Sequence, residues 1–355
     1  MELSTLQKEI VETKKDKVIV LSAAASGKTR VLTERVSYLL DQGADPDKIV
    51  VFTFTNAAAE EMRKRIGEKG NRCFINTVHS YAYYLLTKNG IDTSSAINEE
   101  DFDEFFSLIE KNPEVIEEVD YLLLDEGQDS NFLQYQFILK MIKPKSVFIA
   151  ADVRQSIYEF NGGRPDILLD LVYSSFFTVY NLNENYRNAP AILQFAKHII
   201  TGSVLGDYEL YDDSICMNEE ERGYVSEVEY SLQNVVKFIE ENPPYGSWFV
   251  LTRSNDQLND VVSFLTKMQI PCDTFKRSQI TSDEFKKKMA SDSVKVLTVH
   301  AAKGLEADNV IVIGVGKHSM KAEERRVAYV AATRARKRLV WMKLAKKKKR
   351  ATSWE

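Results

Sequence analysis

The sequence lacks the features of a membrane-spanning, secreted or zinc-binding protein. No apolar run approaches the roughly 20 residues that cross a bilayer, and the first residues show no basic region followed by an apolar one. The three cysteines, Cys73, Cys216 and Cys272, have no Cys-x-x-Cys spacing, which speaks against a zinc site and against a disulfide framework. We therefore expect an intracellular protein with free thiols and no membrane attachment.

A positive charge excess and internal repeats are also missing. The formal net charge of the 355 residues is −5, which argues against a protein that coats nucleic acid by charge alone. The charges are segregated along the chain, since residues 99–118 and 207–229 are acidic and residues 325–350 are strongly basic. The length exceeds what one core usually serves, so we expect two domains.

One loop near the N-terminus has the layout of a phosphate-binding loop. An apolar run at 18–21 leads into Ser22-Ala23-Ala24-Ala25-Ser26-Gly27-Lys28-Thr29, and helical periodicity follows. This order presents backbone N–H groups and a helix N-terminus to phosphates. Lys28 would reach the β- and γ-phosphates, and the Thr29 hydroxyl would bind Mg²⁺. The first glycine of the usual pattern is replaced by Ser22, so an ordinary strand-to-helix connection is the alternative.

Two further strand ends carry groups suited to nucleotide hydrolysis. The apolar run at 119–124 ends in Asp125 and Glu126, which would place one carboxylate toward a metal ion and a second beside the attacking water. The strand at 146–152 leads to Gln155, which we interpret as a γ-phosphate sensor. Arg187 lies beyond the first nucleotide fold, where an arginine finger from a second domain would be required.

Other strand ends carry polar and aromatic residues suited to nucleic acid. Thr55 and Asn56 follow the strand at 49–54 and begin a helix, which places them where phosphodiester contacts are expected. Tyr158 and Phe160 could offer stacking faces to bases or fill a core. His79 could touch nucleic acid, although an isolated histidine after a strand is more often structural.

Gln7 belongs to a short amphipathic helix at 3–11, upstream of the phosphate-binding loop. Its amide could read an adenine edge, because it offers a donor and an acceptor together. A solvated helix residue is the alternative.

Together these segments resemble the motifs of superfamily 1 helicases of the UvrD/Rep type, from Leu3 to about Leu339. Their order along the chain is that of the family. The most specific segments are Phe52-Thr53-Phe54-Thr55-Asn56-Ala57-Ala58, Leu124-Asp125-Glu126-Gly127-Gln128-Asp129, Asp152 with Gln155-Ser156-Ile157-Tyr158, Glu184-Asn185-Tyr186-Arg187, Thr298-Val299-His300-Ala301-Ala302-Lys303-Gly304-Leu305-Glu306 and Tyr329-Val330-Ala331-Ala332-Thr333-Arg334-Ala335.

The resemblance implies a role for each matching position. Gln7 would read adenine, Tyr186 would stack on it, and Glu306 would approach the ribose. The implied catalytic residues are Lys28, Asp125, Glu126, Gln155, Arg187 and Arg334, with Mg²⁺ on Thr29 and Asp125. The implied ATP-binding residues are Gln7, Ser22, Ala25, Ser26, Gly27, Lys28, Thr29, Arg30, Tyr186 and Glu306. Single-stranded DNA would lie along Phe54, Thr55, Asn56, His79, Tyr158, Phe160 and His300.

The implied fold is α/β, with two RecA-like P-loop NTPase domains, central mostly parallel sheets and ATP in the cleft between them. We expect a first domain at 1–175 with a small acidic helical insertion at 89–118, a second domain at 176–345, and a flexible basic tail at 346–355. The implied activity is an ATP-dependent helicase or translocase on single-stranded DNA, 3′ to 5′. Its two domains would close on ATP, and the alternation of closure and opening, coupled to hydrolysis, would ratchet the chain along one strand. We expect a cytoplasmic, nucleoid-associated monomer that acts at junctions of single and double strands, with a replication or recombination protein as partner.

The chain also departs from the family pattern. The large insertions of full-length members are nearly absent, which indicates a minimal motor that separates long duplexes poorly without a partner and would suit a phage or mobile element. A translocase that displaces proteins is one alternative. A regulatory module that binds ATP and DNA without hydrolysis is another. Asn161 stands where an arginine is usual, and Ala151 where a glycine is usual.

Ala25 occupies a position where the family usually has glycine. An alanine at positive φ costs about 1–2 kcal/mol. We therefore expect either that Ala25 adopts negative φ in a reshaped loop or that ATP binds more weakly than usual.

Overall fold

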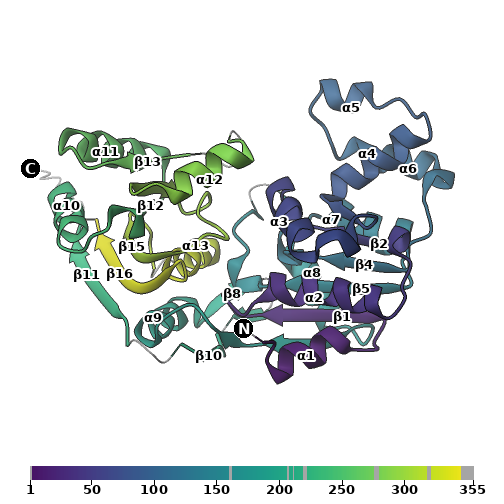
Figure 1. Cartoon of the computed structure of the whole chain (residues 1–355), viewed down its shortest axis with the longest axis horizontal. Helices are drawn as coiled ribbons and strands as arrows, with labels where there is room; N and C mark the ends of the chain where they lie inside the picture. Colours follow the sequence, from purple (N-terminus) through teal and green to yellow (C-terminus); the bar gives the residue numbers. More distant parts are fainter. Residues whose placement is uncertain are drawn as a thin grey trace, which may run out of the picture. The chain divides into compact units, whose positions relative to one another are not determined.

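The computed structural model describes residues 2–159, 162–205, 208–210, 212–218, 222–275, 280–317 and 321–344. Its contacts divide the chain into two compact units (Figure 1). The first unit extends to Glu184 and takes in the short later segment Asp213–Ile215, and the second contains most of the chain from Asn185 onward.

The first unit is built on a six-stranded sheet in the order β3-β2-β4-β5-β1-β6. All neighbouring strands are parallel, so their carboxyl ends meet at one edge. Strands β2 and β5 are buried along their whole length, as expected when helices cover both faces of a parallel sheet. The strands are β1 (Lys17–Ser22), β2 (Ile49–Phe52), β3 (Phe74–Asn76), β4 (Tyr121–Leu124), β5 (Ser146–Ala151) and β6 (Thr178–Leu182).

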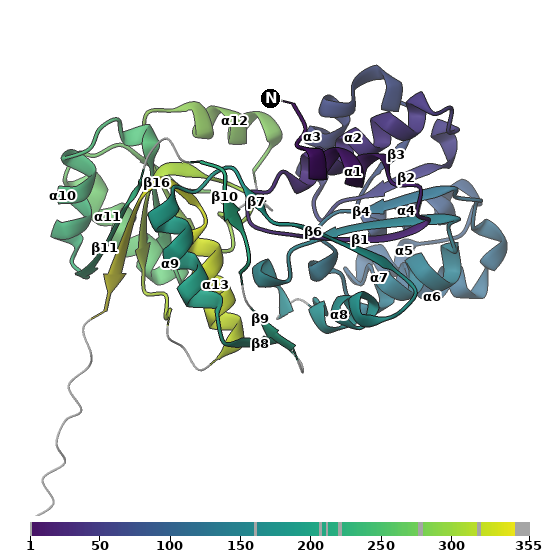
Figure 2. The same cartoon turned by 90° about the horizontal axis from the view of Figure 1, so that it is seen from below.

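Helices cover both faces of this sheet (Figure 2). One core lies under α1 (Thr5–Glu12), α2 (Lys28–Asp41) and α3 (Asn56–Ile66). The other lies under α4 (Val78–Lys88), α5 (Ser94–Asn98), α6 (Glu104–Lys111), α7 (Phe132–Gln136) and α8 (Pro165–Tyr173). The predicted insertion at 89–118 contains α5 and α6, whose apolar residues Ala96, Phe105, Phe106 and Ile109 join the second core.

The second unit has its own six-stranded sheet in the order β11-β16-β15-β12-β14-β13, again with parallel neighbours. Its strands are β11 (Tyr224–Glu229), β12 (Trp248–Thr252), β13 (Cys272–Asp273), β14 (Val294–Thr298), β15 (Ala307–Ile313) and β16 (Ala335–Lys343). The remaining strands form two short ladders, β7 (Glu184–Asn185) with β10 (Ile215–Cys216), and β8 (Ser203–Leu205) with β9 (Tyr208–Leu210).

Helices α10 (Leu232–Glu240) and α11 (Asn255–Lys267) supply apolar residues to the core on one side of this second sheet. Helices α9 (Pro190–Ile200) and α13 (Ala322–Ala332) pack against each other and lie side by side in Figure 2. Helix α12 (Ser282–Ala290) precedes β14. Two largely parallel sheets, each with helices, confirm the predicted α/β class.

The structure differs from the expected domain division at residue 175. Strand β6 lies beyond that position and pairs with β1 along Val18–Ser22, so it belongs to the first sheet. The pattern Thr178-Val179-Tyr180 indicates a strand but carries no information about which sheet it joins. The expected basic tail at 346–355 lies outside the described residues. Among the described residues, no helix is both long and apolar enough to cross a membrane.

Candidate nucleotide and nucleic-acid site

The loop between β1 and α2 is shaped to receive an anion. Lys28 is the first residue of α2, and Gly27 caps the helix in the left-handed region at φ +83°. A Cβ on Gly27 would lie 3.0 Å from Gln7 Nε2, so the close approach requires glycine. Ser26 Oγ is buried and has no hydrogen-bond partner in the described part of the chain. Such a buried hydroxyl at a helix N-terminus fits a phosphate oxygen.

Ala25 adopts φ +59°, so the expectation of a negative φ in a reshaped loop is wrong. The loop turns tightly, with Ser26 N–H donating to Ala23 O at 3.4 Å, and the left-handed residue lies inside this turn. The other expectation, weaker binding of ATP, stays a prediction.

We expect Ala25→Gly to tighten nucleotide binding by up to about 30-fold. Removing a strain of about 1–2 kcal/mol favours the closed loop over opened forms. Fluorescence titration with a labelled ATP analogue measures the change. Ala24→Gly is the matched control, because Ala24 has no positive φ. An unchanged affinity for Ala25→Gly would show that the alanine is neutral.

Lys28 contacts both carboxylates that follow β4. Its Nζ lies 2.7 Å from Glu126 Oε1 and 3.7 Å from Asp125 Oδ1. Burial alone would lower the pKa of Lys28, but the charges of Glu126 and Asp125 outweigh it, so the pKa lies above its ordinary value. The ammonium is therefore charged at neutral pH and can move from these carboxylates to a phosphate.

The backbone after β4 is bent to bring Asp125 and Glu126 to the sheet edge. Glu126 has left-handed dihedral angles, φ +54° and ψ +42°, and its N–H donates to Asp125 Oδ1 at 2.9 Å. Strained non-glycine residues of this kind occur at functional sites. A Cβ on Gly127 would lie 2.6 Å from Ile149 Cγ2, so glycine lets this turn pack against β5.

Gln155 ends a single helical turn, Val153–Gln155, just after β5. Its Nε2 donates to Asp152 Oδ2 at 2.7 Å. The predicted residues Lys28, Asp125, Glu126 and Gln155 thus all follow strands β1, β4 and β5 at the carboxyl edge of one sheet. The neighbouring residues Gln128 and Arg154 are also buried, and the sequence alone assigned no role to them. Their polar side chains next to the Asp-Glu motif and to Gln155 were the signal that could have pointed to them.

Gln7 closes the phosphate-binding loop from the side of α1. Its Nε2 donates to Ser26 O at 3.0 Å, and its Oε1 accepts from Ser4 N at 3.1 Å in a capping box. Gln7 is 2% exposed, so the alternative of a solvated helix residue is wrong. Reading of adenine by Gln7 stays a prediction, as does a role for Arg30, whose Nη1 donates to Glu2 O at 3.3 Å.

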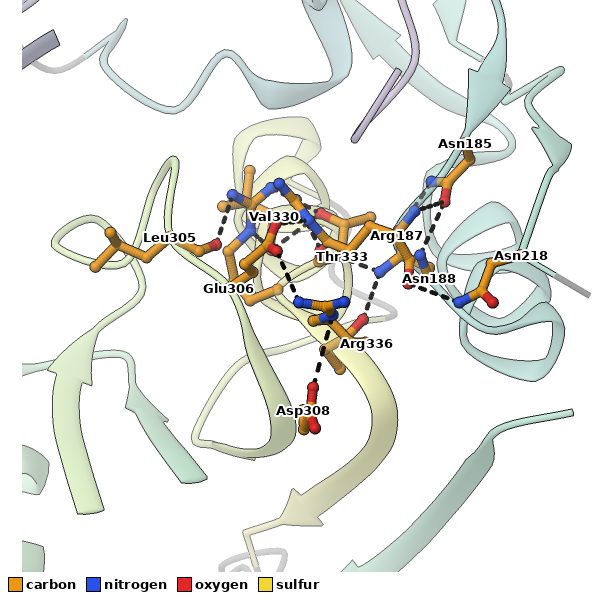
Figure 3. Close-up of polar contacts among 12 residues, drawn as sticks. Asn185, Arg187, Asn188, Asn218, Leu305, Glu306, Asp308, Val330, Thr333 and Arg336 are labelled. Carbon is orange, nitrogen blue, oxygen red and sulfur yellow. Dashed lines mark hydrogen bonds and ion pairs between the residues drawn. The ribbon is translucent and has the colours of Figure 1, made fainter. Parts of the chain in front are cut away.

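In the second unit the predicted site residues Arg187 and Glu306 contact each other (Figure 3). The Arg187 guanidinium donates to Glu306 and, at 3.4 Å, to Thr333 O. Arg334 donates to Leu305 O at 3.2 Å and to Val330 O at 3.0 Å. Arg336 approaches the other Glu306 oxygen at 3.4 Å.

Burial lowers the pKa of Arg187 while the charge of Glu306 opposes that shift. A guanidinium stays protonated at neutral pH nonetheless. Arg187 therefore carries a fixed positive charge with a defined orientation. Tyr186 precedes it and is partly buried; its stacking on adenine stays a prediction.

Some predicted DNA-binding residues lie together in the first unit. The rings of Phe54 and Tyr158 stack with centroids 4.9 Å apart and planes at 26°, and Phe54 is 37% exposed. Thr55 caps α3 through a bond from Ala58 N at 3.2 Å, and Asn56 begins that helix. Phe160 and Asn161 lie outside the described residues. His300 lies in the second unit, just after β14.

His79 contacts the acidic insertion. Its Nε2 lies 2.9 Å from Asp103 Oδ1, and its ring lies beside Phe106 with centroids 5.2 Å apart. The hydrogen bond with His79 is the main cause that lowers the pKa of Asp103. This arrangement gives His79 a structural role beside its predicted contact with DNA, which stays a prediction.

The oxygen donors at this site suit a cation that also binds phosphate. Among the described residues, no group of three or more His, Cys, Asp or Glu side chains could hold a metal ion. Mg²⁺ is usually bound through one or two protein groups plus phosphate oxygens and water. Asp125 and Thr29 supply two such oxygen donors, so the donor set fits Mg²⁺.

Comparison with known families gives matches in both units. Residues 3–115 and 101–174 match the family model of the UvrD/REP helicase N-terminal domain, and residues 273–346 match that of the UvrD-like helicase C-terminal domain. The first match covers the phosphate-binding loop and the Asp125-Glu126 pair. The second covers Glu306 and Arg334.

Three curated relatives illustrate the similarity. The chain is 24% identical to a probable DNA helicase II homolog of Mycoplasma capricolum, over 72% of this chain and 49% of the relative. It is 24% identical to a probable DNA helicase of Mycoplasma pneumoniae, over 90% of this chain and 79% of that relative. It is 25% identical to the ATP-dependent DNA helicase PcrA of Staphylococcus epidermidis, over 76% and 50%. The chain thus spans about half the length of the first and third.

Proposed function

The chain belongs to the UvrD/Rep family of superfamily 1 helicases, and on that premise we propose that it is a DNA-stimulated ATPase and helicase that moves along single-stranded DNA. The observation that supports this most is the ion-paired cluster of Lys28, Asp125 and Glu126 at the carboxyl edge of the first sheet. These are the charged groups that phosphoryl transfer from ATP requires.

We assign the chemistry as follows. Lys28 and the loop N–H groups hold the phosphates, and Asp125 with Thr29 holds Mg²⁺, which when bound neutralises phosphate charge. Glu126 takes a proton from water as the water oxygen bonds to the γ-phosphorus and the bond to ADP breaks. Arg187 and Arg334 of the second unit stabilise the charge of the transferred group. This assignment requires the second unit to close on nucleotide held by the first.

We further propose that Phe54 and Tyr158 present ring faces to bases of the single strand. The stack of these two side chains supports this, because Phe54 is 37% exposed and Tyr158 is only partly buried. A 3′ to 5′ direction, action at junctions of single and double strands, a monomeric state and a replication or recombination partner are extensions of the same proposal. Family membership favours them.

Hydrolysis of ATP with and without single-stranded DNA tests the proposal. We expect DNA to stimulate hydrolysis by the intact chain and Lys28→Ala to abolish it. A lack of stimulation would reject the motor function. Strand displacement on substrates with a 3′ or a 5′ overhang then determines direction, and displacement of bound protein without unwinding would favour the translocase alternative.

A module that binds ATP and DNA without hydrolysis is the other alternative, suggested by the strained Ala25. The paired Lys28 and Glu126 count against it, since both groups serve turnover. Nucleotide binding without hydrolysis at saturating DNA would support this alternative.

A further inference from the structure

Gln128 lies between Glu126 and the end of β5 and is fully buried. Its Nε2 donates to Glu126 Oε2, and its Oε1 accepts from Asp152 N–H at 2.9 Å. A side-chain amide can donate and accept at the same time. One side chain therefore links the predicted water-activating carboxylate to the neighbouring strand.

The link continues from Asp152 in two directions. Asp152 is 1% exposed, and its Oδ2 accepts from Gln155 Nε2 at 2.7 Å. Its Oδ1 accepts from Arg154 Nε at 2.9 Å, and Arg154 Nη2 donates to Ser22 O at 2.7 Å. Buried polar groups that satisfy one another in this way hold a defined geometry. The network thus joins Glu126, the predicted γ-phosphate sensor and the start of the phosphate-binding loop.

The two oxygens of Glu126 have different partners. Lys28 contacts Oε1 and Gln128 contacts Oε2. When Lys28 binds a phosphate instead, its contact with Glu126 Oε1 is lost. The contact from Gln128 does not depend on Lys28, so it can persist through that exchange.

We propose that Gln128 is a positioning residue, which keeps Glu126 oriented toward the attacking water after Lys28 engages phosphate and couples that orientation to Gln155. This inference rests on the proposed ATPase function. Misplacing a reacting group by about 1 Å can cost 10²-fold in rate. Loss of Gln128 should therefore affect turnover far more than binding.

Two substitutions test the hydrogen bonds that Gln128 makes with Glu126 and with Asp152 N–H. Gln128→Leu removes both of these hydrogen bonds and a longer one to Asp129 Oδ2 at 3.4 Å, whereas Gln128→Glu keeps an acceptor for Asp152 N–H and sets a second carboxyl group against Glu126. We expect both to lower kcat about 10- to 100-fold, with the KM for ATP and the affinity for single-stranded DNA within about twofold of the unaltered chain. Gln134→Leu is the matched control. Gln134 is another glutamine shortly after β4, but its side chain accepts from Asn131 N–H in the capping box of α7.

Hydrogen exchange without nucleotide gives a readout that does not depend on turnover. We expect faster exchange of the Asp152 amide in Gln128→Leu, and exchange like that of the unaltered chain in Gln128→Glu and Gln134→Leu. A double-mutant cycle with Gln155→Ala should be non-additive in kcat. Unaltered kcat in both Gln128 variants, or strict additivity with Gln155→Ala, would overturn the inference. Absence of DNA-stimulated hydrolysis by the unaltered chain would instead reject the proposed function itself.

Discussion

Glu126→Gln should lower the DNA-stimulated turnover of ATP by about 10²- to 10⁴-fold, the range expected for loss of a general base. Nucleotide affinity should be equal or higher. In the structure Lys28 pairs with Glu126 at 2.7 Å, and phosphate must compete for that ammonium. A neutral amide at position 126 removes the nearest negative charge and leaves Asp125, at 3.7 Å, as the nearest carboxylate, which makes Lys28 easier to recruit.

Steady-state hydrolysis at saturating single-stranded DNA, together with titration of a fluorescent ATP analogue, separates these two effects. Glu61→Gln is a suitable control. Glu61 is also a glutamate paired with a basic residue, but it pairs with Arg65 on the exposed side of α3. Turnover of Glu126→Gln within threefold of the unaltered chain would show that another group accepts the proton.

The sequence predicted the edge of the first sheet well because its signals are local. An apolar run followed by a loop with Gly-Lys-Thr, or by Asp-Glu, predicts a strand and places these residues beyond its carboxyl end. Parallel pairing then brings Lys28 and Asp125 together, although they are far apart in sequence. The fold class follows from the same alternation of strands and helices.

What the sequence could not predict depends on tertiary partners. The φ of Ala25 is set by the turn that Ser26 and Ala23 close, and no propensity encodes it. Gln7 resembles a surface residue of an amphipathic helix until the loop approaches and accepts its hydrogen bond. The bond between Gln128 and Asp152 likewise exists only once β4 and β5 pair.

Arg187→Ala should lower turnover by about 10³-fold or more, because a correctly placed arginine contributes 10³–10⁵ in related phosphoryl transfers. Stability should change little. When Arg187 is removed, Glu306 keeps Arg336 as a partner at 3.4 Å, and Thr333 O still accepts from Asn188 Nδ2 at 3.1 Å. ATP and single-stranded DNA should bind the variant almost normally, since the residues assigned to holding phosphate lie in the first unit.

Arg187→Lys distinguishes charge from geometry. A lysine retains the positive charge but lacks the planar fork that donates to Glu306 and Thr333 O together. We therefore expect it to restore only a small part of the lost rate. Arg338→Ala serves as the control in the same unit, since Arg338 lies over the Tyr224 ring. If Arg187→Ala weakened ATP binding in proportion to turnover, Arg187 would be a binding residue, and transition-state stabilisation would have to come from Arg334.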